Sequence, residues 1–272
     1  MYAREKVLMV VVAALVLAVP PAASRADESA SLPRAEEIVR KALDRMKEAD
    51  AEQYYAHYTF SQRAVVEKLD ERGAVKERSE ELYRVYPVEG LPFQELVERN
   101  GAPLSDKERK KQEERLRKLR QARSQKKGAG EEDEMTIRLD EETASRFRFE
   151  VLARESINGR SAFVLSLEPK KGKLPVRKKV DNILNRLAGK IWIDEQAYEI
   201  AKVDVHLTEP VRLWLGILAS IRHIEFSLQQ QEIDSGPWFP ARFDMLVEGR
   251  VLFSSIHERQ RVEWNGFERF AQ

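Results

Sequence analysis

Residues 189–208, GKIWIDEQAYEIAKVDVHLT, decide the fold class of this chain. Between positions 201 and 207 apolar and polar side chains alternate, which is typical of a β-strand with one face in water. The apolar set is Ala201, Val203, Val205 and Leu207, and the polar set is Lys202, Asp204 and His206. Residues 189–194 also have strand composition, and the short turn at 195–197 predicts that the two strands form a hairpin.

Further hairpins are predicted on both sides of this one. Residues 53–69 and 74–86 flank a turn at 70–73, and residues 147–157 and 160–168 flank Asn158-Gly159. Asn100-Gly101 is another tight-turn signal, because both residues tolerate a positive φ. Strands at 221–231 and 238–264 follow across Gly236-Pro237. Because strands follow one another through turns, about ten strands should form one curved antiparallel sheet with an apolar face on every strand.

Two segments have helical spacing. Residues 32–50 place apolar side chains along one face of an amphipathic helix, and residues 178–187 predict a shorter one. These helices can cover part of the apolar face of the sheet. The predicted fold class is therefore β-rich α+β.

The N-terminus has the order of an export signal. Residues 1–6 carry Arg4 and Lys6, residues 7–19 are uniformly apolar, and small residues precede position 27. The apolar run is shorter than the roughly 20 residues that span a bilayer, so a signal peptide at 1–26 with cleavage after Ala26 is preferred to an uncleaved anchor. Without cysteine near this site, lipidation is excluded. We therefore expect a soluble periplasmic protein with no integral membrane segment after cleavage.

Composition excludes several functions. The chain has 47 basic and 46 acidic side chains and no cysteine, which argues against nucleic acid as a partner and removes disulfides, thiolate catalysis and cysteine metal sites. Residues 105–134 form a charged insertion, in which Ser105 and Glu108 have capping-box spacing. Its basic run could contact nucleic acid or anionic lipid, but a solvated helical excursion is the preferred interpretation.

No catalytic constellation can be assembled. The histidines at 57, 206, 223 and 257 lack metal-ligand spacing, and the motifs of serine hydrolases, phosphate loops and zinc proteases are absent. We therefore predict no enzyme activity, no catalytic residue, no metal and no cofactor. The apolar stretch 211–221 is interpreted either as a buried segment or as a flap over a cavity. The flap residues are Trp214, Leu215, Ile217 and Leu218.

Two short motifs resemble a known family. They are GKIWID at 189–194, followed by a turn and an alternating strand, and GPWFPAR at 236–242, leading into the last two strands. With the first helix and the hairpin series they resemble the LolA/LolB-like superfamily, the periplasmic lipoprotein carriers and outer-membrane lipoprotein-sorting proteins. The resemblance implies a single domain at 27–272, an open, incomplete β-barrel wrapped over two or three helices. It also implies an apolar cavity for acyl chains and no catalysis.

Strand parity gives the side chains expected to line that cavity. They are Val151, Phe163, Leu165, Leu167, Ile191, Ile193, Val203, Val205, Leu207, Ile224, Phe226, Phe239, Phe243, Met245 and Val247. The expected function is a non-catalytic carrier of lipid or lipoprotein acyl chains in envelope trafficking. The alternative is a protein-interaction module of the same fold, an envelope-stress sensor or assembly accessory, whose partner is an envelope membrane protein.

Overall fold

A computed structural model describes residues 32–52, 54–124, 140–213, 219–252 and 254–270. Its helical elements are α1 (Ala35–Glu52), the 3-10 turn η1 (Tyr54–Ala56), α2 (Asp106–Ser124), α3 (Glu141–Ser145) and α4 (Asp181–Leu184). Its strands are β1 (Tyr58–Leu69), β2 (Val75–Val88), β3 (Leu91–Arg99), β4 (Ala102–Pro103), β5 (Phe147–Ile157), β6 (Arg160–Pro169), β7 (Leu187–Asp194), β8 (Ile200–Leu207), β9 (Val211–Leu213), β10 (Ala219–Glu232), β11 (Trp238–Val251) and β12 (Ser254–Arg269).

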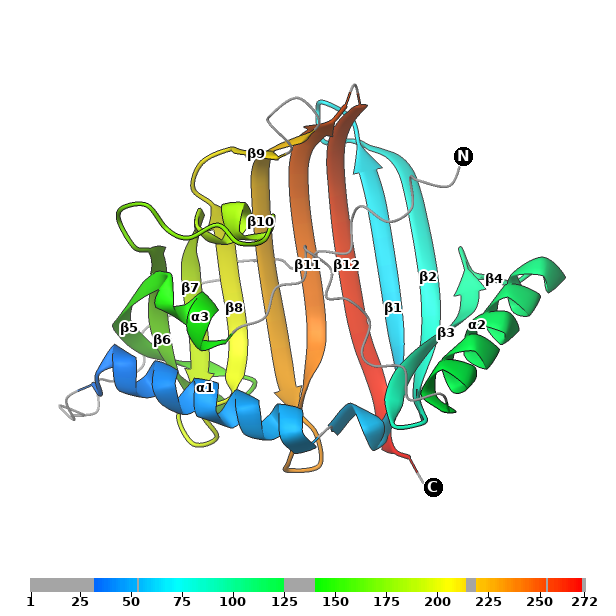
Figure 1. The fold of residues 1–272 in the computed structure, drawn as a ribbon, viewed down its shortest axis with the longest axis horizontal. Helices are drawn as coiled ribbons and strands as arrows, with labels where there is room; N and C mark the ends of the chain where they lie inside the picture. Colours follow the sequence, from blue (N-terminus) through cyan, green and yellow to red (C-terminus); the bar gives the residue numbers. More distant parts are fainter. Residues whose placement is uncertain (1–31, 53, 125–139, 214–218, 253, 271–272) are drawn as a thin grey trace.

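The described strands form one 12-stranded antiparallel sheet (Figure 1). Its order is β4-β3-β2-β1-β12-β11-β10-β8-β7-β6-β5, with β9 paired to β10. The first strand lies beside the last, and Tyr58 is opposite Arg269. Among the described residues no pairing joins β4 to β5, so the sheet stays open. The β-rich fold class with a curved antiparallel sheet is confirmed, with two strands more than the sequence predicted.

The predicted Asn-Gly turns are present. Asn158 and Gly159 have φ values of 52° and 80°, and Asn100 and Gly101 have 52° and 74°. These left-handed conformations at both central positions match the right-handed twist of the flanking strands. In each of the hairpins β5–β6 and β3–β4, the backbone preference of the Asn-Gly pair is therefore enough to specify the turn.

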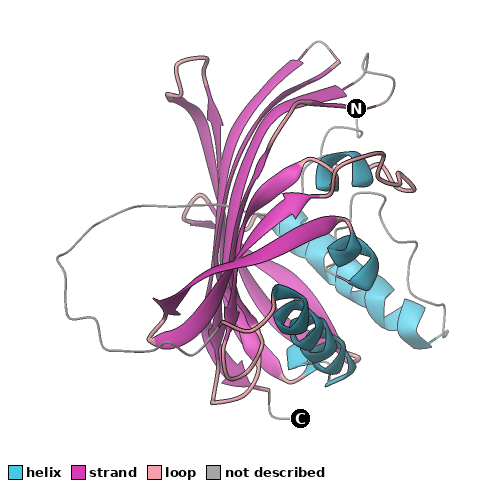
Figure 2. Cartoon of the chain, turned by 90° about the vertical axis from the view of Figure 1, so that its left-hand side faces the viewer, coloured by secondary structure: helices cyan, strands magenta, loops and turns pink. Residues whose placement is uncertain are grey.

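All the described helices lie on one side of the sheet (Figure 2). α1 crosses the lower ends of β5 to β8 and packs Ile38 and Ala42, 1% and 4% exposed, onto the sheet. Below them lie Leu165 and Ile193, which are almost fully buried. An isolated helix of this length is marginal in water, so this packing stabilises α1.

A second core lies between α4 and the middle of the sheet. Ile183 and Leu184 of α4 join Phe243 and Val205 in one buried cluster, and Phe243 is only 1% exposed. Val211 of β9 is part of the same cluster. The flap residues Trp214, Leu215, Ile217 and Leu218 lie outside the described residues.

The expectation of an apolar face on every strand is wrong at β1. Gln62 lies directly opposite Trp264 of β12 and is only 7% exposed. Its Oε1 accepts hydrogen bonds from Trp264 Nε1 at 3.2 Å and from Gln94 Nε2 at 3.1 Å. A buried amide is tolerated because its polar atoms find partners.

The charged insertion begins as predicted and lies beside β3 (Figure 1). Ser105 N donates to Glu108 Oε2 at 3.0 Å, and Glu108 N donates to Ser105 Oγ at 3.4 Å, which is a capping box. Residues 125–134 of the insertion and the predicted signal at 1–26 lie outside the described residues. No helix in the described part of the chain is long and apolar enough to cross a membrane.

Candidate functional site

The fifteen side chains that strand parity selected pack into three clusters. Under α1 lie Phe163, Leu165, Ile191 and Ile193, with Val151 and Val203 partly buried beside them. Under α4 lie Leu167, Val205, Leu207, Ile224, Phe243, Met245 and Val247, with Phe226 partly buried beside them. Phe239 belongs to an aromatic cluster near η1. Their contact with lipid stays a prediction, because in this structure they contact one another.

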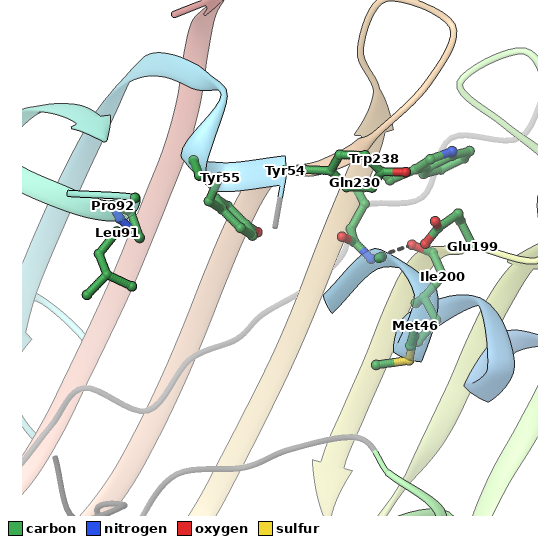
Figure 3. A pocket seen from close by; sticks show the side chains of 12 residues that line it. Met46, Tyr54, Tyr55, Leu91, Pro92, Glu199, Ile200, Gln230 and Trp238 are labelled. Carbon is green, nitrogen blue, oxygen red and sulfur yellow. Dashed lines mark hydrogen bonds between the residues drawn. The ribbon is translucent and has the colours of Figure 1, made fainter. Parts of the chain in front are cut away.

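A cavity of about 410 Å³ lies next to these clusters, at the end of the sheet where α1 meets η1 (Figure 3). Five segments supply its walls: the last turns of α1, η1, the β2–β3 turn, the start of β8, and the adjoining ends of β10 and β11. The lining residues are Met46, Ala49, Tyr54, Tyr55, Ala56, Gly90, Leu91, Pro92, Glu199, Ile200, Gln230 and Trp238. Most of these side chains are apolar or aromatic, as in typical small-molecule pockets.

Arg45 fixes the position of α1 and η1 against the sheet. Its Nε donates to Glu199 Oε1 at 2.8 Å, and its Nη2 donates to the Tyr54 hydroxyl at 2.9 Å. The side chain of Glu199 is 7% exposed, so this ion pair is largely removed from water. One turn earlier, Lys41 Nζ donates to the Tyr198 hydroxyl at 3.2 Å. The helix is thus held to the β7–β8 turn by charge and hydrogen bonding at the rim of the cavity.

The β7–β8 turn is built around Asp194, which is 1% exposed. Arg160 donates to both carboxylate oxygens, at 2.6 and 2.9 Å, and the backbone N–H groups of Gln196 and Ala197 donate to Oδ1. Burial acts to raise the pKa of Asp194, but the hydrogen bonds from Arg160 and the two N–H groups outweigh it and lower the pKa. The turn that presents Glu199 and Ile200 therefore rests on an ionised carboxylate.

The aromatic cluster forms the side of the cavity near η1. The ring of Tyr55 meets the fully buried ring of Phe239 edge-on, with 5.1 Å between centroids. Phe239 also contacts Tyr58, Phe60 and Phe267 at centroid distances of 4.9 to 6.0 Å. This wall is consequently well packed.

A second, much smaller apolar space, here called the seam, lies along the underside of α1. Its volume is about 20 Å³, and it is lined only by apolar side chains, among them Val39, Ile191 and Ile193. Met46 and Ile200 line both the cavity and the seam. These two side chains therefore lie between the cavity and the seam.

The polar and ionisable groups that line the cavity are few. Among the described residues no group of three or more histidine, aspartate and glutamate side chains could hold a metal. No histidine or serine is among the lining residues described above, and the carboxylate of Glu199 is paired with Arg45. Sequence reasoning missed this cavity. The consecutive Tyr54-Tyr55 and the Gly-Pro sequence at 236–237 mark two of its five segments, but nothing local joins them.

The fold and the cavity define a protein with an open antiparallel sheet and a mainly apolar cavity at one end of it. No family model and no curated protein matches the sequence. The structure is similar to a LolA superfamily protein from Nitrosomonas europaea, with 11% identity, 89% of this chain and 96% of the other covered, and a TM-score of 0.34.

Two further solved structures show the same kind of similarity. One is an outer membrane lipoprotein-sorting protein domain from Vibrio parahaemolyticus, with 11% identity, 85% and 93% coverage, and a TM-score of 0.32. The other is the MucA/MucB complex of Pseudomonas aeruginosa, with 11% identity, 87% and 100% coverage, and a TM-score of 0.26.

Proposed function

We propose that this protein is a non-catalytic binder and carrier of acyl chains in the bacterial envelope. The observation that carries the proposal is the cavity of about 410 Å³, which is lined mainly by apolar side chains. It shares the lining residues Met46 and Ile200 with the seam under α1. This volume lies within the roughly 300–1,000 Å³ range of small-molecule sites. The export-signal pattern of residues 1–26 supports a periplasmic location for the carrier.

The cavity suits a flexible hydrocarbon chain better than a polar metabolite. Each buried methylene contributes about 0.8 kcal/mol, which corresponds to about fourfold in affinity. Side chains such as Met46 and Leu91 adapt to irregular chains because they have several rotatable bonds. A ligand of this kind needs few polar contacts for its affinity.

Chain-length dependence tests the proposal. Calorimetric titration of the mature protein with monoacylglycerols of increasing length should show affinity rising about fourfold per methylene until the cavity and seam are filled, and then a plateau. Native mass spectrometry should also detect co-purifying lipid. Affinity that is independent of chain length, or no binding at any length, would contradict the proposal.

Two variants on α1 test whether the acyl chain binds in this cavity. Ala49 lines the cavity, whereas Asp44 is exposed on the same helix and does not. Ala49→Trp should fill the cavity and weaken binding at least about tenfold, a difference of 1.4 kcal/mol. Asp44→Trp should bind as the wild type does. Equal binding by both variants would move the acyl site elsewhere on the sheet.

A second candidate function is protein docking at α2. A groove of about 550 Å³ lies between α2 and β3, and Lys111, Arg115 and Lys118 are among its lining residues. Such a surface would suit an acidic envelope protein. A crosslinked partner that is lost on deletion of residues 105–134, together with an absence of bound lipid, would favour this function over the carrier.

A further inference from the structure

The polar groups of the cavity are few and have defined roles. Among the described lining residues, Glu199 is the one side chain with a full charge, and no lysine, arginine or histidine is present. In the described part of the chain, two guanidinium groups contact lining residues. That of Arg45 already contacts Glu199 through Nε, Glu48 through Nη1 and the Tyr54 hydroxyl through Nη2. That of Arg160 lies over the Trp238 ring and already contacts Asp194 and Glu232. The cavity therefore offers an anion no cation that is not already engaged.

Gln230 is held in one orientation. Its Nε2 donates to the backbone carbonyl of Ile200 at 2.7 Å. Because a carbonyl can only accept, the amide group that faces it must be the NH₂, and Oε1 is turned the other way. In Figure 3 this oxygen points toward the cavity and away from Ile200. It presents a hydrogen-bond acceptor to a ligand.

We propose that the cavity selects acyl chains whose head group is uncharged and carries a hydrogen-bond donor, such as an N-acyl amide or a monoacylglycerol. This inference rests on the proposed carrier function. A ligand N–H or O–H donates to Gln230 Oε1, which is otherwise desolvated when the cavity fills. A free fatty-acid carboxylate is disfavoured, because it would be buried beside Glu199 without a cation of its own.

The inference predicts different affinities for three ligands with the same acyl chain length. N-methyldodecanamide and methyl dodecanoate differ only in the N–H group that replaces the ester oxygen, and dodecanoate carries the charge. Titration calorimetry on the mature wild-type protein at neutral pH should give dodecanoate at least about tenfold weaker binding than the amide. Monododecanoylglycerol, which donates through O–H, should bind like the amide. A difference in affinity between these two ligands identifies which donor group, N–H or O–H, the cavity prefers.

Variants of Gln230 test the hydrogen bond itself. For each variant we compare the ratio of amide affinity to ester affinity with the same ratio in the wild type. The two ligands differ in hydrophobicity by the same amount in every variant, so this difference cancels. Gln230→Leu should lower this ratio about tenfold. Gln231 is the next residue on β10 and does not line the cavity, so Gln231→Leu should leave the ratio unchanged.

Each outcome has a separate meaning. Dodecanoate binding as tightly as the amide in the wild type, or an unchanged ratio in a folded Gln230→Leu variant, would overturn the inference and leave acyl binding intact. The wild-type comparison does not depend on any variant folding. Failure of all four ligands to bind would overturn the carrier function together with this inference.

Discussion

Replacement of Phe239 by alanine should destabilise the protein more than other single truncations of its aromatic cluster. The side chain is 0% exposed and its ring contacts Tyr55, Tyr58, Phe60 and Phe267. Tyr55 and Phe267 also contact Phe60, so their movement into the vacated space would break these contacts. The substitution should therefore leave a cavity and not a collapsed site.

The magnitude follows from the buried ring. A buried phenylalanine removes roughly 150–250 Å² from water, worth about 4–6 kcal/mol at about 25 cal/mol per Å², and alanine keeps part of this. Phenylalanine-to-alanine changes in cores cost about 3–5 kcal/mol. We expect a loss of about 4 kcal/mol. For a chain of this size that lowers Tm by about 8–16 °C.

Thermal unfolding followed by circular dichroism provides the assay, with urea unfolding as a second measure of the free energy of unfolding. Phe270, which is 39% exposed at the end of β12, is the matched control. Phe270→Ala should change stability by no more than about 0.5 kcal/mol. If Phe239→Ala melts within about 2 °C of this control, the aromatic cluster does not stabilise the end of the sheet and the reasoning is refuted.

Two further predictions concern the β7–β8 hairpin. A Cβ on Gly189 would lie 2.0 Å from the backbone oxygen of Asp204, so Gly189→Ala should cost about 3 kcal/mol by forcing the strands apart, and a variant with wild-type urea stability would contradict this close approach. The pKa of Asp194 is lowered in the folded protein, so its contribution to stability is present above the unfolded pKa of about 3.9 and is lost as pH falls through the lower folded value. Asp194→Asn should therefore be less stable by about 3 kcal/mol at neutral pH, because Arg160 loses its two hydrogen bonds to the buried carboxylate and keeps only its pairing with Glu232. The urea midpoints of the variant and the wild type should converge only as the pH falls through the lowered folded pKa of Asp194. A stability difference that is constant with pH would show that the ionised form of Asp194 is not what matters.

The hairpins were predictable because their signals are local. Asn158-Gly159 specifies a turn by its own backbone preferences, and the alternation around Val203 and Val205 specifies which side chains share a face. Within each hairpin, the position of the turn and the face of each side chain together indicate how the two strands are paired. The capping box at Ser105 is predictable for the same reason, because both of its partners lie within one helical turn.

The two amphipathic helices were expected to cover part of the sheet, but which strands each of them covers was not predictable. Leu165 and Ile193 are on the face that alternation selects, but nothing in their own segments indicates that Ile38 of α1 packs onto them. The cavity is harder still to foresee. Its walls combine Ala49, Leu91 and Gln230 from segments that lie far apart in sequence, and each contributes only the end of an element.

The pairing of β1 with β12 has a consequence for the order in which the chain folds. Tyr58 and Arg269 must meet across almost the whole sequence, which gives the sheet a high contact order and a slow final step. The hairpins β1–β2 and β5 to β8 can form as soon as they are synthesised, whereas β1 can join the rest of the sheet only when β12 is present. The sheet is therefore completed only after the C-terminal strand has been made, and truncation of β12 should separate β1 to β4 from the other strands.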